Sequence, residues 1–276
     1  MKLLILGMGY SGKVFAEKMR RDGWQVRGTS RSAENGLLQW PGSDISATLD
    51  WASHILVCAA PDENGDPFLA GLTAQIIAAQ PVWLGYLSTT GVYGDHGGAW
   101  VDEGTALTPA TSRGVQRVKA EAQWLGLHGA HGLPVHIFRL AGIYGPGRGP
   151  FAKVRAGTAR RIIKKDQVFS RIHVQDIAQV LAASIKQPDP GRVYNVCDDD
   201  PAPPQDVIAH AARLLGLPLP PKLDFETAAL TPMARSFYAE SKKVRNDRIK
   251  AELGVRLRYP DYKSGLQALL AQERAD

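Results

Sequence analysis

Short apolar runs, separated by longer amphipathic segments, recur along most of the chain. The apolar runs predict strands at residues 2–6, 24–29, 54–60, 82–87, 135–140 and 193–196. Segments of helical period predict helices near residues 12–22, 67–80, 109–128 and 174–186. Strands that are apolar on both faces are typical of a parallel sheet covered by helices on its two sides. The pattern therefore predicts an α/β fold built on a doubly wound parallel sheet.

The pattern changes after residue 196, where three aspartates (198–200) and prolines at 201, 203 and 204 interrupt it. Two amphipathic helices are expected further on, near residues 241–253 and 261–273. We interpret this tail, with an excursion at residues 146–165, as a smaller C-terminal substrate-binding cap domain. The predicted sheet domain then comprises residues 1–145 and 166–197, and the predicted cap comprises residues 146–165 and 198–276.

Composition narrows the class of protein. The 276 residues are 44% hydrophobic and 22% charged, which is ordinary for a soluble globular chain. The apolar runs are far shorter than the ~20 residues of a membrane helix, and the N-terminal segment lacks the apolar core of a secretory signal. Cys58 and Cys197 form no CxxC pair, which argues against a disulfide framework. We therefore expect a cytoplasmic protein with no membrane association.

The net charge and the spacing of the histidines indicate which kinds of ligand to expect. The formal net charge of +6 permits an anionic small molecule, but no stretch alternates basic with aromatic residues as in a single-strand nucleic-acid platform. No HxxxH or HxH pair lies near acidic residues, so no metal site is expected. The expected partner is a small molecule rather than nucleic acid.

A glycine-rich turn follows the first predicted strand and opens the first helix. It reads Gly7-Met8-Gly9-Tyr10-Ser11-Gly12, a GxGxxG. The first glycine permits a tight turn, the second lets backbone approach a pyrophosphate, and the third lets helix pack close to strand. Strand, glycines, helix and second strand in this order predict a Rossmann-type dinucleotide site.

The end of the second strand bears on the type of nicotinamide cofactor. It reads Val-Arg-Gly-Thr-Ser30-Arg31, without the acidic residue that usually holds the adenosine ribose of NAD. Ser30 and Arg31 suit a 2′-phosphate, which favours NADP(H) over NAD(H); a solvated surface arginine is the alternative interpretation of Arg31. Ala59 and Ala60, at the end of the third predicted strand, complete the expected cofactor contacts.

Five segments in the right order resemble the extended, epimerase/dehydratase-like branch of the short-chain dehydrogenase/reductase superfamily. They are LSTTGVYG at 87–94, DE with a following proline at 102–109, RLAGIYGPGR at 139–148, SRIHVQDIA at 170–178 and YNV at 194–196. The resemblance extends over nearly the whole length. It implies that Thr89 is the catalytic Ser/Thr, with Ser88 as a weaker candidate.

The catalytic Tyr-x-x-x-Lys of that family is incomplete in this sequence. Lys119 aligns with the lysine, which in the family binds the nicotinamide ribose and lowers the tyrosine pKa, whereas Val115 occupies the tyrosine position. The chain thus resembles atypical members of the family. The candidates for proton transfer are Thr89, Lys119, a bound water, and a tyrosine such as Tyr93 or Tyr144.

Three interpretations of function remain open: an NAD(P)-dependent oxidoreductase, a non-catalytic NADP(H)-binding redox sensor, and a non-redox enzyme for a nucleotide-like substrate. The expected substrate-binding residues are Tyr144, Arg148, Arg171 and His173. Basic residues are concentrated in the segment 151–175, which suits a phosphate-bearing ligand such as a nucleotide-sugar but also a solvated cationic surface. The family often dimerises through the helix of Lys119, so a homodimer is a further expectation.

Overall fold

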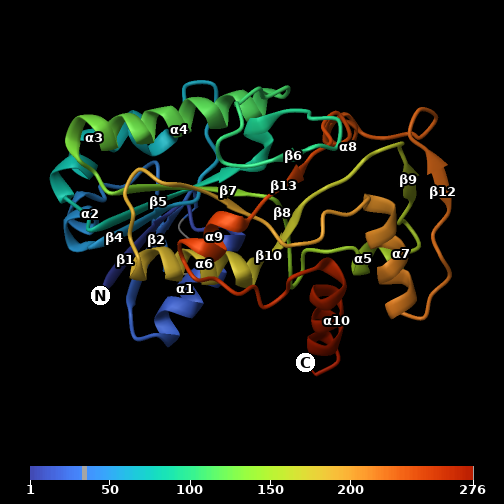
Figure 1. The fold of residues 1–276 in the computed structure, drawn as a ribbon. Coiled ribbons are helices and arrows are strands. Elements are labelled where there is room, and N and C mark those ends of the chain that lie inside the picture. Colours follow the sequence, from blue (N-terminus) through green and yellow to red (C-terminus); the bar gives the residue numbers. More distant parts are fainter. Residues whose placement is uncertain (33–35, 276) are drawn as a thin grey trace.

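The computed structural model describes residues 1–32 and 36–275. Its centre is a parallel sheet of seven strands (Figure 1). In spatial order these are β11 (Val193–Val196), β7 (Val135–Leu140), β5 (Trp83–Thr89), β4 (His54–Val57), β1 (Lys2–Leu6), β2 (Gln25–Ser30) and β3 (Leu38–Gln39). All neighbouring strands pair in parallel. The predicted α/β fold with a doubly wound sheet is confirmed.

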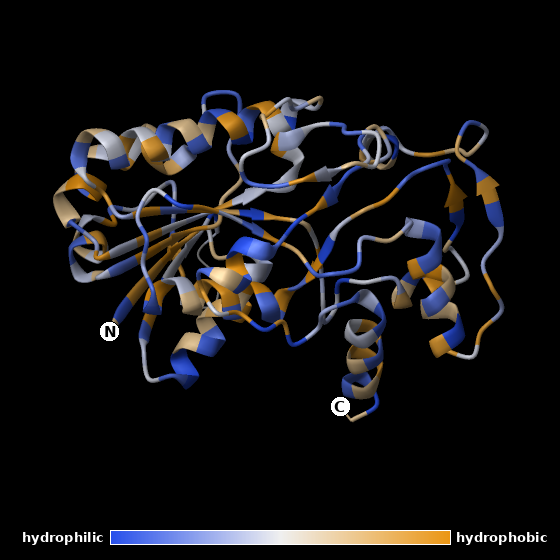
Figure 2. Cartoon of the chain, in the orientation of Figure 1, coloured by the Kyte–Doolittle hydropathy of each residue, from blue (hydrophilic) through white to orange (hydrophobic). Residues whose placement is uncertain are grey.

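The residues of β1, β4, β5, β7 and β11 divide between two hydrophobic cores. On one face, Leu3 and Ile5 pack with α1 (Tyr10–Arg21) and α6 (Val174–Lys186). On the other face, Leu4 and Leu6 pack with α2 (Ser46–Trp51), α3 (Pro67–Ala79) and α4 (Ser112–His131). Because both faces are covered, every position of β1 after its first residue is buried, which explains the unbroken apolar run in the sequence. Figure 2 shows these strands as mainly hydrophobic.

The remaining elements lie mostly beyond the carboxyl edge of the sheet (Figure 1). They are η1 (Thr90–Tyr93), β6 (Trp100–Val101), β8 (Gly142–Tyr144), α5 (Phe151–Arg155), β9 (Arg161–Ile163), β10 (Arg171–His173), α7 (Pro204–Leu214), β12 (Lys222–Asp224), α8 (Pro232–Phe237), β13 (Lys243–Val244), α9 (Asp247–Ala251) and α10 (Tyr262–Glu273). Residues of α5, α7 and α10 share a separate hydrophobic core. The division into a sheet domain and a cap stays a prediction, although this second core supports it.

The segment after residue 240 differs from the expected helix at 241–253. Lys243 and Val244 form β13, which pairs in parallel with β6, and only the short α9 follows. Ile249, Leu253 and Val255 then pack into the α1/α6 core of the sheet. The tail is therefore shared between the second core and the sheet. No helix in the described residues is both long and apolar enough to cross a bilayer.

Candidate functional site

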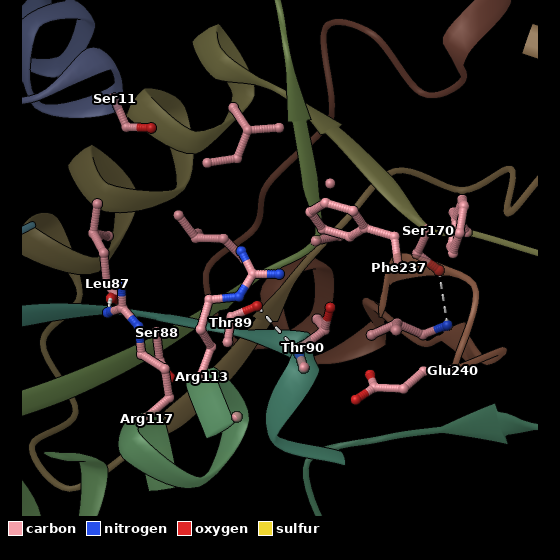
Figure 3. A pocket seen from close by; sticks show the side chains of 18 of the residues that line it. Ser11, Leu87, Ser88, Thr89, Thr90, Arg113, Arg117, Ser170, Phe237 and Glu240 are labelled. Atoms are coloured by element: carbon pink, nitrogen blue, oxygen red, sulfur yellow. Dashed lines mark hydrogen bonds between the residues drawn. The ribbon is translucent and has the colours of Figure 1, made fainter. Parts of the chain in front are cut away.

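A cavity of about 530 Å³ lies at the carboxyl edge of the sheet (Figure 3). Its walls come from the glycine-rich turn after β1, the ends of β5 and β7, the start of α4, and the segment that runs from α8 to β13. β1 and β4 are neighbours whose chain connections run to opposite faces, so the strand order reverses between them. Doubly wound folds bind ligands at such a switch point.

The glycine turn leaves space where a dinucleotide would need it. Gly7 has a φ of +75°, and a Cβ there would lie 3.0 Å from the Cβ of Ala59. A Cβ on Gly12 would lie 3.1 Å from Cγ2 of Ile5, so this glycine permits close packing of helix on strand. A Cβ on Gly9 would instead point into open space, 4.0 Å from its nearest neighbour, the Gly7 carbonyl oxygen. Since Gly9 lines the cavity, the turn fits the close approach of a pyrophosphate.

The remaining predicted cofactor residues lie around this turn. Gly7 N donates to Thr29 Oγ1 (2.9 Å), which ties the turn to the end of β2. Ser30 is half-buried at that strand end, and Arg31 is exposed just beyond it; both lie outside the main cavity. Tyr10, Ser11 and Gly12 line the cavity, and no side chain caps the N-terminus of α1.

Thr89 and Ser88 differ in how their hydroxyl groups are used. Thr89 lines the cavity, and its Oγ1 accepts a hydrogen bond from Gly91 N (3.2 Å). In the described part of the chain nothing accepts the Thr89 hydroxyl proton, so it is available to a ligand. Ser88 Oγ instead donates to Glu121 Oε1 (2.5 Å) inside the protein. Both residues line the cavity, but of the two hydroxyl groups that of Thr89 is the one free to donate to a ligand.

The expected register of α4 is wrong by two residues. Val115 is 55% exposed, and exposed Lys119 donates from Nζ to the Glu63 carbonyl (3.0 Å); neither lines the cavity. Arg113 and Arg117 line it instead. Positions two apart on a helix point in nearly opposite directions, so Val115 and Lys119 cannot share the face of these arginines.

Gly114 fixes this rotation of the helix. A Cβ there would lie 2.7 Å from Cβ of Pro109 and 2.9 Å from the Gly91 carbonyl, so only glycine allows this close contact with the segment that follows β5. The spacing in the sequence is compatible with this register but does not select it. Arg113, Arg117 and Glu121 recur every four residues, and buried Glu121 marks the row that faces the sheet.

Arg117 is held at the cavity wall by β5. Its Nη1 donates to the Leu87 carbonyl (2.5 Å) and to the Tyr86 hydroxyl (3.0 Å). Arg113 is exposed at the cavity, with its guanidinium 5.1 Å from the ring centroid of Phe237 in α8. The cavity therefore presents two guanidinium groups, four residues apart, beside Thr89.

The two weaker tyrosine candidates lie outside the cavity. The Tyr93 hydroxyl donates to Asn195 Oδ1 (2.7 Å) and accepts from Arg139 Nη1 (3.0 Å) in a buried network. The Tyr144 hydroxyl donates to the Asp261 carbonyl (3.3 Å), and burial raises its pKa far above the usual value. Both side chains thus hold the protein together rather than facing a substrate in this cavity.

Only Arg148 among the predicted substrate residues lines this cavity, with its guanidinium 5.6 Å from the ring centroid of Tyr10. Arg171 donates instead to the carbonyls of Phe169 and Ala202. His173 is buried at the start of α6, where Nδ1 accepts from Gln175 N (3.2 Å). Burial lowers its pKa to about 4, so it is a neutral helix cap rather than a substrate contact.

Sequence reasoning missed the wall formed by the segment from α8 to β13. Phe237, Glu240 and Lys242 line the cavity there, whereas the sequence predicted only a helix beginning near residue 241. Cys58 was also missed; it lines the cavity, and burial raises its pKa to about 12, which keeps the thiol neutral. In the described residues, no cluster of His, Cys, Asp and Glu could hold a metal ion.

Comparison with known proteins places this geometry in a family. Residues 73–197 match the model of the NAD-dependent epimerase/dehydratase family. A structure of a conserved protein of unknown function from Silicibacter pomeroyi is 60% identical, with 98% of each chain covered and a TM-score of 0.93.

Two more distant relatives also span the chain. A structure described as an NAD-dependent epimerase/dehydratase from Methylobacillus flagellatus is 30% identical, with 99% of this chain and 98% of that chain covered and a TM-score of 0.75. Protein YeeZ of Escherichia coli is 29% identical over 94% of this chain and 97% of its own length. The chain therefore belongs to the NAD-dependent epimerase/dehydratase family.

Proposed function

We propose that this protein is an NADP(H)-dependent oxidoreductase for an anionic small molecule, of the nucleotide-sugar type or a related class. The observation that carries the proposal is that one continuous cavity joins the glycine turn to Thr89, Arg113 and Arg117. A hydride-transfer enzyme needs a nucleotide cradle and a polar substrate site in one enclosure. The cavity offers both.

The chain offers matching groups for each part of the cofactor. Gly9 and the N-terminus of α1 would hold the pyrophosphate, and Ser30 with Arg31 would hold a 2′-phosphate. Arg117, at the helix position that faces the cavity, would donate to the nicotinamide ribose in place of the family lysine. When bound, the nicotinamide supplies or accepts the hydride.

Arginine side chains select the charge of the substrate. Arg113, Arg117 and Arg148 line the cavity, and Arg113 and Arg148 lie on exposed parts of its wall. Guanidinium groups bind carboxylate and phosphate through paired hydrogen bonds, so an anionic substrate is favoured. The free proton of the Thr89 hydroxyl would orient the reacting oxygen of that substrate.

Arg113 also supports the second candidate, an NADP(H)-binding redox sensor. It faces the cavity near the place where the family has its proton-shuttling tyrosine, and a guanidinium gives up no proton near neutral pH. A protein that retained the cradle and lost the proton shuttle would bind cofactor without turnover.

One experiment separates these candidates. Binding of NADPH and NADH is measured by calorimetry, and deuterium transfer from 4-deuterated NADPH is then followed by mass spectrometry with 2-oxo acids and a UDP-4-keto-hexose as probes, since both carry a carbonyl group that can accept hydride. Deuterium in a product supports the oxidoreductase. Tight NADPH binding without transfer to any probe supports the sensor, and a failure of both cofactors to bind would overturn both proposals.

Arg31→Ala is expected to remove most of the preference for NADPH over NADH. A charge-assisted contact to the 2′-phosphate contributes about 1.5–3 kcal/mol, or about ten- to a hundredfold in affinity. Calorimetric Kd values for both cofactors check this, with exposed Arg27→Ala as control. Equal Kd values for the two cofactors in the wild-type protein would contradict the assignment.

Arg117→Met is expected to weaken cofactor binding about tenfold or more, whereas Lys119→Met should leave it unchanged. The first change removes a guanidinium from the cavity wall, and the second removes an exposed ammonium group outside it. Fluorescence titration with NADPH measures both. If Lys119→Met weakened NADPH binding more than Arg117→Met, the result would support the register of α4 that the sequence predicted.

A further inference from the structure

Glu240 and Lys242 form an ion pair in the wall of the cavity. Their side chains are 12% and 10% exposed, and Lys242 Nζ lies 2.6 Å from Glu240 Oε2. Both residues line the cavity, and in Figure 3 the Glu240 carboxylate extends toward the side that carries Thr90. The arginines described above come from α4 and from the loop after β8. Glu240 therefore contributes an acidic group to a cavity otherwise rich in cations.

The backbone around this pair is fixed by hydrogen bonds to two other segments. The Glu240 carbonyl accepts from Gln167 Nε2 (2.7 Å), and Ser241 N donates to Asp95 Oδ1 (2.7 Å). Lys242 Nζ also donates to the Gly94 carbonyl (2.6 Å). The carboxylate is thus held in place before any ligand arrives, which is the arrangement of a preorganised binding group.

One oxygen of this carboxylate lacks a partner. Lys242 satisfies Oε2, but Oε1 is buried and receives no hydrogen bond from the described residues. A buried acceptor that is left unpaired costs free energy, and the cost is larger for a charged group. A hydrogen-bond donor on a ligand in the cavity would remove this cost.

We propose that Glu240 Oε1 accepts a hydrogen bond from a hydroxyl group of the substrate. A hydroxyl suits the site better than an ammonium group, because the Lys242 ammonium already lies against the same carboxylate and would repel a second cation. The anionic end of the substrate rests on the proposed function, with Arg113 and Arg148 as its partners. The substrate class that follows is a hydroxylated anion, such as a sugar acid or a sugar phosphate.

The test compares two carboxylates of the same ring size. Glucuronate carries hydroxyl groups, and cyclohexanecarboxylate does not; binding of each is measured by ligand-observed NMR, with and without NADP⁺. The wild-type protein should bind glucuronate at least tenfold more tightly. Glu240→Gln should erase that difference, since the charge-assisted bond is lost, whereas Glu226→Gln, an exposed change in the same part of the chain, should preserve it.

Several outcomes would overturn this assignment. They are equal affinity of the wild-type protein for the two probes, no saturable binding of either probe, or an undiminished preference in Glu240→Gln. Glu240→Asp provides a second variant, which keeps the charge but withdraws the oxygen by one methylene and should also weaken glucuronate. Failure of NADPH to bind would contradict the proposed function alone, because the two probes can still be compared without cofactor.

Discussion

Replacing Gly9 with valine is expected to abolish dinucleotide binding while leaving the protein folded. The new side chain would occupy the cavity at the turn where the pyrophosphate must approach the backbone. Gly9 has a φ of −87° and extended backbone, a conformation that valine adopts readily. Its Cβ would meet no protein atom closer than 4.0 Å, so the fold has no reason to change.

Calorimetry with NADPH measures the loss of binding, and urea unfolding measures the stability. Gly126→Val is the matched control, since this glycine is exposed on α4 and a Cβ there would meet nothing within 4 Å. The control should retain wild-type affinity. A folded Gly9→Val protein with wild-type affinity would show that the cofactor binds elsewhere.

The fold could be predicted from the sequence because its strands are buried on both faces. The apolar run at β1 needs no tertiary information to be recognised, and Gly7, Gly9 and Gly12 mark the turn that follows it. The same holds for α6, whose predicted bounds agree with the structure. These elements are specified locally, by periodicity and by backbone requirements.

The rotation of α4 could not be read from hydrophobicity. Its cavity face carries arginines rather than apolar residues, and Val115, the residue that an apolar pattern would bury, is 55% exposed. What sets the rotation is the close contact of Gly114 with Pro109 and Gly91. That contact depends on how distant segments pack, which the spacing within the helix does not contain.

The wall formed by Glu240 and Lys242 was missed for a related reason. The segment resembles an amphipathic helix in sequence, yet β13 pairs with β6, more than a hundred residues away, and draws it into extended structure. Lys242 also bonds the distant Gly94 carbonyl. Long-range strand pairing thus overrides the local preference for helix. It also places in the cavity polar groups that no local sequence motif predicts.

Arg139→Met is expected to destabilise the protein by about 3–5 kcal/mol, because it leaves the Glu121 carboxylate buried without its cation. The side chains of this ion pair are 6% and 3% exposed, and Nη2 lies 2.7 Å from Oε2. Arg139 Nε donates to the same carboxylate, and Nη1 donates to the Tyr93 hydroxyl. The substitution therefore removes several buried hydrogen bonds together.

Urea unfolding followed by circular dichroism measures the change, with Arg245→Met as control. Arg245 pairs with Asp247 at 2.7 Å, but both side chains are more than half exposed, so its loss should change the stability far less than the loss of Arg139. Equal effects of the two substitutions would contradict the assigned role of the buried pair.

The double variant Glu121→Leu/Arg139→Met should recover much of the lost stability, since it removes the unpaired carboxylate that makes the single change so costly. It would also release Ser88, whose hydroxyl is bonded to Glu121 next to the catalytic candidate Thr89. Recovery of stability without recovery of substrate binding would then show that this buried pair also positions the cavity wall.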